Sequence, residues 1–208
     1  MGLKTTALAA AMLLGMSAPG LAKPVLLVGN KGEDTVSFID LPSGRELARL
    51  PTGKWPHEIA VSPDGRTAAV VAYGGTTIDL FDIARRAKLR SIDLAPNAGP
   101  HGIVWTRGNQ LVVTTERSKS VALADPRAGR LLSAIATDQA GTHMVAVTRD
   151  GRRAFTANIP AGTVSVLDLK AGRKLRDLAV GGRPEGIALS QDEKLLWVAD
   201  LDTPRVQA

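Results

Sequence analysis

The chain has 208 residues, a formal net charge of +6 and no cysteine. Its length suits one domain, and the absence of thiols excludes disulfides, iron–sulfur clusters, thiolate metal sites and a cysteine nucleophile. Nucleic acid is not an expected partner, because three Trp, three Phe and one Tyr provide few platforms for base stacking.

Residues 1–22 have the pattern of a secretory signal peptide. The positively charged MGLK precedes the apolar TTALAAAMLLGM and the small residues of SAPGLA, and cleavage is expected after Ala22. The alternative is an N-terminal membrane anchor, but the apolar run is shorter than the roughly 20 residues that span a bilayer. No later segment is long enough to be a transmembrane helix. The mature domain, residues 23–208, is therefore expected to be periplasmic or secreted.

The mature sequence repeats every 42 to 44 residues. The segments PHEIAVSPDG, PHGIVWTRGN, THMVAVTRDG and PEGIALSQDE begin at Pro56, Pro100, Thr142 and Pro184. A second series consists of the aspartates that end VSFID and the equivalent segment of each later repeat. They are Asp40, Asp82, Asp125 and Asp168. Three of the four aspartates are followed by a Gly-Arg pair, at Gly44, Gly129 and Gly172, and we expect the aspartates to cap turns through their side chains.

Each repeat contains about four short apolar runs separated by turn residues, which predicts four strands. A four-stranded unit of this length is typical of a β-propeller blade. The sequence thus predicts an all-β propeller of four-stranded blades. Strands B, C and D of a first blade fall in 24–53, full blades in 56–97, 100–138 and 142–181, and a partial blade in 184–208.

About four blades are present, and we expect an incomplete part of a seven-bladed ring. Val206 aligns with the start of a blade's third strand, so the last blade is unfinished. The alternative is a four-bladed ring in which the strand from Glu185 to Ser190 completes the first blade.

The segments PHGIVW, SPDGRTAAV, RDGRRAFTAN and TVSVLDLKAGR resemble the YVTN-type propeller repeats of exported bacterial proteins. The resemblance covers nearly the whole mature chain and implies a binding scaffold. GPHGIVW followed by TTERSKSV also resembles part of the strand-and-acid pattern of propeller lactonases. Those enzymes carry an additional basic residue beside the histidine, where this chain has Gly102.

All three histidines occupy one column of the repeat, at the start of the innermost strand of a blade. The next strand is antiparallel and ends at the same rim of the central channel. Polar residues from both strands are therefore expected around one opening. The candidate ligand-binding residues are His57, His101, His143, Glu185, Glu116, Asn158 and Tyr73.

Three interpretations of this rim remain open. Pro-His before a strand can be a purely structural device. The rim can also bind a small molecule or a periplasmic protein partner. Finally, imidazole and carboxylate suit Zn, Cu or Fe, and a transition metal, if present, would use His101, His143 and Glu116. No cofactor and no catalytic residue follow from the sequence itself.

These interpretations give two functions. The first is a periplasmic binding or scaffold propeller. The second is a metal-dependent oxidoreductase or lactonase-like hydrolase that uses the same residues. The spread of Lys and Arg predicts a solvated surface, with attraction to an anionic lipid or an acidic partner as the alternative.

Overall fold

The structure, a computed structural model, describes residues 24–208. The expected signal peptide, residues 1–22, lies outside the described residues. The described part contains eighteen strands and one short 3₁₀ helix, η1 (Glu116–Ser118). None of its helices is long and apolar enough to cross a membrane.

The strands form five antiparallel sheets, each built from consecutive strands. The first two sheets are β1 (Val25–Asn30), β2 (Thr35–Asp40) and β3 (Glu46–Pro51), then β4 (Pro56–Val61), β5 (Thr67–Ala72), β6 (Thr77–Asp82) and β7 (Ala87–Asp93). The next two are β8 (Pro100–Trp105), β9 (Leu111–Thr115), β10 (Ser120–Asp125) and β11 (Arg130–Ala136), then β12 (Thr142–Val147), β13 (Arg153–Asn158), β14 (Thr163–Asp168) and β15 (Arg173–Ala179). The last comprises β16 (Pro184–Leu189), β17 (Leu196–Asp200) and β18 (Val206–Gln207).

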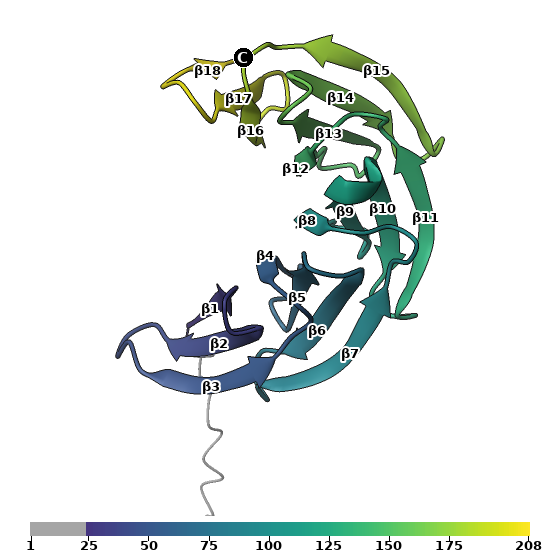
Figure 1. The fold of residues 1–208 in the computed structure, drawn as a ribbon. Helices are drawn as coiled ribbons and strands as arrows, with labels where there is room; N and C mark the ends of the chain where they lie inside the picture. The colour runs from purple at the N-terminus through teal and green to yellow at the C-terminus, as the bar shows by residue number, and fades with distance from the viewer. Residues whose placement is uncertain (1–23) are drawn as a thin grey trace, which may run out of the picture.

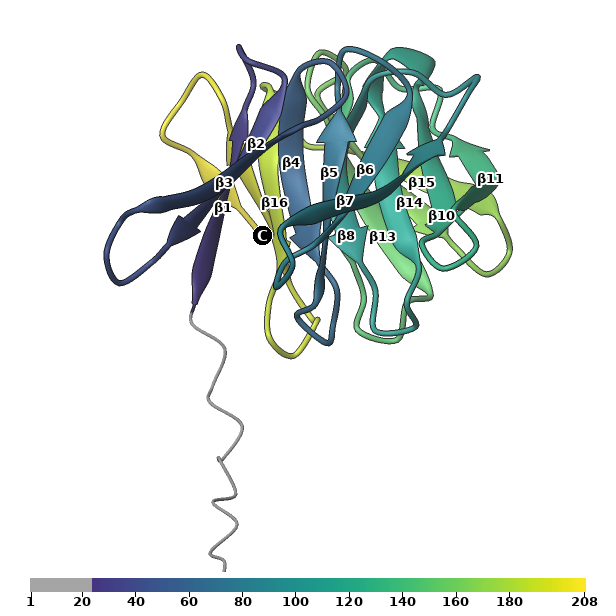
Figure 2. The same cartoon turned by 90° about the horizontal axis from the view of Figure 1, so that it is seen from below.

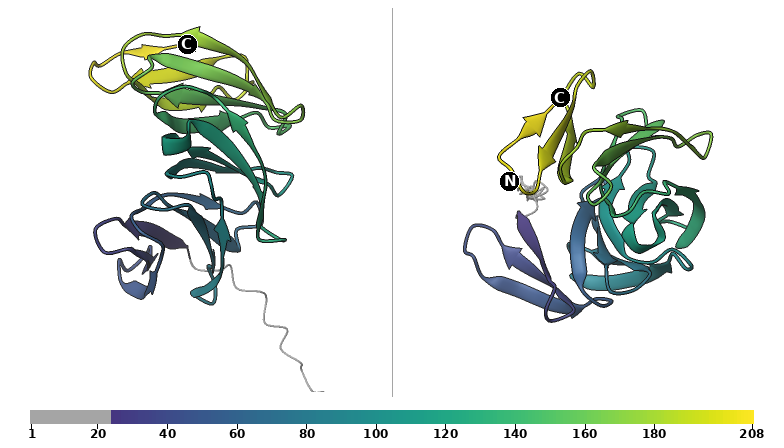
Figure 3. Two further views of the ribbon diagram at one scale, coloured as in Figure 1. Left: turned by 45° about the vertical axis from the view of Figure 1, so that its right-hand side comes forward. Right: turned by 45° about the horizontal axis from the view of Figure 1, so that its top comes forward.

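The five sheets are the blades of an arc (Figure 1). Strands β1, β4, β8, β12 and β16 lie on its concave side, and β3, β7, β11 and β15 lie on its outer side. Each inner strand contacts the inner strand of the next blade, and Figure 2 shows the blades from below. In the right-hand view of Figure 3 the arc opens between the purple β1–β3 blade and the yellow β16–β18 blade. The predicted all-β propeller with four-stranded blades is confirmed.

The four-bladed alternative is wrong for the described residues. It required the strand from Glu185 to Ser190 to complete the first blade. Instead, β16 pairs with β17, and the first sheet consists of β1, β2 and β3 alone.

The core lies between neighbouring blades, which explains the consecutive apolar residues of the middle strands. On β5, Ala68 and Val70 pack towards Val36 and Phe38 of the first blade. Ala69 and its neighbours on the same face pack towards the third blade. Side chains alternate between the faces of a strand, so a strand covered on both faces is apolar at every position.

The aspartate series caps turns, as predicted. The carboxylate of Asp82 accepts a hydrogen bond from the Arg85 backbone N–H at 2.7 Å. Asp168 accepts the corresponding bond from the N–H of Ala171 at 2.8 Å. These aspartates lie far along the blades from the histidine column and have a structural role.

Candidate functional site

An irregularity of the inner strands positions the histidines. The ladder between β8 and β9 shifts register between Pro100 and Ile103, around His101. Similar shifts occur around His57 in β4 and His143 in β12, and around Glu185 in β16. A β-bulge redirects the side chain that it contains. The same irregularity therefore directs the side chain at the equivalent position in four blades.

The three imidazoles lie against one another. The ring centroids of His57 and His101 are 4.0 Å apart, and those of His101 and His143 are 3.7 Å apart. Tyr73 packs edge-on against His57 and His101, with centroids at 5.8 and 5.5 Å. Four of the seven predicted site residues therefore form one ring cluster, which we call the histidine cluster.

Gly102 and Thr114 allow this close approach of the third and fourth blades. A Cβ atom on Gly102 would lie 2.8 Å from the carbonyl oxygen of His143 and 2.9 Å from Cα of Met144. The buried Thr114 hydroxyl donates a 2.5 Å hydrogen bond to that carbonyl oxygen. It also accepts a 2.8 Å bond from the N–H of Gly102. The backbone of β12 is thus fixed directly against that of β8.

Two of the predicted carboxylates flank His143, one at each ring nitrogen. Glu116 Oε2 lies 3.1 Å from Nδ1, and Glu185 Oε1 lies 3.7 Å from Nε2. The hydrogen bond from His143 is the main cause that lowers the pKa of Glu116. Glu116 is therefore a carboxylate acceptor near neutral pH, whereas the half-exposed Glu185 lies at the edge of the cluster.

His101 is the central and most buried member, with 2% of its surface exposed. Burial, reinforced by the two neighbouring imidazoles, lowers its pKa to about 3. Its Nδ1 atom is buried and has no hydrogen-bond partner in the described part of the chain. Most buried polar groups in proteins are hydrogen-bonded, so this neutral imidazole needs an explanation.

The sequence interpretation missed several charged residues around the cluster. The Lys31 ammonium and Arg117 guanidinium lie 5.4 and 4.9 Å from the Tyr73 ring centroid. Glu58 Oε1 lies 3.5 Å from His57 Nδ1. Burial and then the charge of Lys31 lower the pKa of His57. Arg117 and Glu58 could have been found as the direct chain neighbours of Glu116 and His57.

Asn158 does not join the histidine cluster. Its side chain is fully buried within the fourth blade. Its amide donates hydrogen bonds to the hydroxyls of Thr163 and Ser165 at 3.1 and 2.9 Å. Asn30 makes the equivalent bonds to Thr35 and Ser37 in the first blade. In these two blades the asparagine that ends the strand, β1 or β13, therefore has a structural role.

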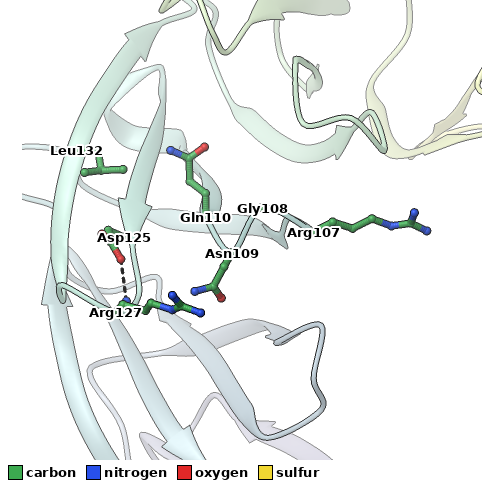
Figure 4. Close-up of a pocket in the computed structure, with 7 residues that line it drawn as sticks. All are labelled: Arg107, Gly108, Asn109, Gln110, Asp125, Arg127 and Leu132. Atoms are coloured by element: carbon green, nitrogen blue, oxygen red, sulfur yellow. Dashed lines mark hydrogen bonds between the residues drawn. The ribbon is translucent and has the colours of Figure 1, made fainter.

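A separate hollow of about 510 Å³ lies at the opposite end of the third blade (Figure 4). The turn after β8 and the turn after β10 line it, with Arg107, Asn109 and Arg127 among its residues. The Arg127 backbone N–H donates a hydrogen bond to Asp125. Because β8 separates this hollow from His101, it is not part of the histidine cluster.

Two groups, each formed by two cluster histidines and one neighbouring carboxylate, have the composition of a metal site. His57, Glu58 and His101 form one group, and His101, Glu116 and His143 form the other. In each, one donor atom per residue lies within 4.8 Å of the others. The second group consists of the same three residues that the sequence selected for a transition metal.

Comparison with known proteins identifies the family of this chain. Residues 29–208 match the model of a family described as lactonase, 7-bladed beta-propeller. The chain belongs to this family. The arc of five sheets fits part of such a ring, and the expected resemblance to YVTN-type propellers is confirmed at the level of the family.

Two curated relatives are YncE proteins, described as uncharacterized, from Salmonella typhi and Salmonella typhimurium. Each is 30% identical over 94 residues, which is 45% of this chain and 26% of the relative. The match thus spans about a quarter of those proteins. A chain of Kuenenia stuttgartiensis hydrazine synthase has the same fold, with a TM-score of 0.75 and 18% identity over 90% of this chain and 58% of that one.

Proposed function

We propose that this propeller is a periplasmic or secreted binding protein that holds a small ligand or a partner protein at the histidine cluster. The signal-like composition of residues 1–22 supports the location. The absence of a P-loop, a nucleophile elbow or another catalytic motif in the sequence favours binding over catalysis.

The unpartnered His101 Nδ1 atom is the observation that carries the proposal. Leaving a buried donor or acceptor unpaired costs about 1–3 kcal/mol. A purely structural histidine would be expected to bond a nearby backbone carbonyl. Here the ring instead lies between two other imidazoles, next to a carboxylate and a phenol, which together offer both donors and acceptors to a polar ligand.

Thermal unfolding in the presence of a library of polar metabolites tests the proposal. A ligand at one hundred times its Kd stabilises the folded protein by about 2.7 kcal/mol. We expect this stabilisation to be lost in His101→Ala and Glu116→Ala, and kept in Glu46→Gln, which changes an exposed carboxylate on the outer strand β3. Equal stabilisation of all four proteins would overturn the proposal.

Lactone hydrolysis is a second candidate function, because of the family match and one specific contact. The Glu116 carboxylate orients the His143 ring at 3.1 Å, as a general base is oriented in many hydrolases. Hydrolysis of sugar lactones by the wild type, reduced at least about a hundredfold in His143→Gln, would favour this candidate. No turnover above the uncatalysed rate would exclude it for the substrates tested.

A further inference from the structure

The group formed by His101, His143 and Glu116 indicates which class of ligand the histidine cluster binds. We propose that these three side chains bind a divalent late first-row transition ion, Zn²⁺ or Cu²⁺. The inference rests on the proposed function, because it identifies what the histidine cluster binds.

The separations of the donor atoms suit one ion. Bonds of about 2.0–2.2 Å in a tetrahedral site place neighbouring donors roughly 3.3 Å apart. His143 Nδ1 and Glu116 Oε2 are already 3.1 Å apart, and all three donors lie within 4.8 Å of one another. Rotation of the side chains can bring the donor atoms from this separation to the distance that one ion requires. The hydrogen bonds of Thr114 to Gly102 and His143 meanwhile hold the two backbones in place.

The donor chemistry selects the class of ion. Two imidazole nitrogens and one carboxylate oxygen are the ligands that zinc and copper prefer. Calcium and magnesium require six or more oxygen ligands, or several retained waters, and gain little from imidazole.

The other group, with His57 and Glu58, is less suitable for a cation. The Glu58 side chain is 40% exposed and lies 3.5 Å from His57. By contrast, Glu116 is 23% exposed, and Glu185 adds a further carboxylate at the outer side of His143. A second carboxylate near a ligating histidine strengthens metal binding.

Metal titration of the protein, purified without a polyhistidine tag and stripped with EDTA, tests the assignment. We expect the wild type to bind one equivalent of Zn²⁺ in calorimetry. Glu116→Gln and His143→Asn should each weaken binding at least about tenfold, while Glu58→Gln, which changes only the carboxylate of the other group, should bind as the wild type does. Loss of binding in Glu58→Gln alone, or equal binding in all four proteins, would overturn the assignment.

Copper electron paramagnetic resonance gives a readout that does not depend on affinity. The Cu²⁺ complex of the wild type should show hyperfine coupling to two imidazole nitrogens, and that of His143→Asn to one. Thermal unfolding of each metal-free variant shows whether it is folded. A signal without nitrogen coupling in the wild type would overturn the assignment.

The two proposals fail in different ways. If the wild type binds no ion, yet a metabolite stabilises it and not His101→Ala, the metal inference is wrong and the proposed function stands. If neither ion nor metabolite binds in a way that depends on His101, both are wrong.

Discussion

The imidazole rings of His101 and His143 lie 3.7 Å apart, centroid to centroid, although the residues come from different blades. Two features bring them together: a β-bulge at the start of each inner strand and the absence of a side chain at Gly102. The repeat gives both histidines the same place in their blades. Gly102 then lets the blades approach closely enough for the rings to touch.

Replacing Gly102 with alanine should disturb this contact. The added Cβ would meet the β12 backbone at 2.8–3.0 Å, so the two blades must move apart. Overpacking of this kind costs about 1–3 kcal/mol, which urea unfolding measures. Gly32→Ala is the matched control, because nothing lies within 4 Å of its added Cβ. Equal stability of Gly102→Ala and Gly32→Ala would contradict the described packing.

Acid should destabilise the protein through His101. Its pKa of about 3 in the folded state lies below the ordinary value of 6.5. Between these values the unfolded chain binds a proton that the folded chain does not, so stability is full above pH 6.5 and falls as the pH is lowered towards 3.

Between pH 7 and 4.5, this group alone should remove about 2–3 kcal/mol from the free energy of unfolding. His101→Gln should lose correspondingly less over the same interval, as urea unfolding at the two pH values would show. The acidic residues titrate in both proteins, so the comparison isolates the imidazole. Parallel losses in the two proteins would mean that His101 is not buried as a neutral ring.

Asn158→Ala should lower stability without affecting ligand binding. The substitution removes the acceptor of the buried Thr156 hydroxyl and the amide that donates to Thr163 and Ser165, at a cost of about 1–3 kcal/mol. Any ligand of the histidine cluster should keep its Kd within about twofold. Unchanged stability together with lost binding would instead place Asn158 in the site.

The fold could be predicted from the sequence because the repeat supplies several independent series with one period. Three series predicted the same succession of strands in each blade. They are the apolar runs, the capping aspartates such as Asp82, and the histidine column. The histidine column, together with the residue that follows or ends the second strand of each blade, also brought His101, His143 and Glu116 to one rim, since both series occupy equivalent positions in adjacent blades.

Side-chain direction was harder to predict than position. Asn158 and Glu116 share a column, but the short amide of Asn158 bonds Ser165 inside its own blade. Ala122 occupies the equivalent of Ser165 in the third blade and offers no such partner, while the longer Glu116 reaches His143 in the neighbouring blade. An Asn followed seven residues later by Ser, as in Asn30 and Ser37, is the signal that could have separated the two roles.

Contact between the three imidazoles is the central claim, and nuclear Overhauser spectroscopy tests it most directly. The chain has only three histidines, so protein labelled with ¹³C-histidine and made without a tag has three ring systems. We expect ring-to-ring cross-peaks between His57 and His101 and between His101 and His143, assigned with single His→Gln variants. A folded wild type without any cross-peak between histidine rings would contradict the account.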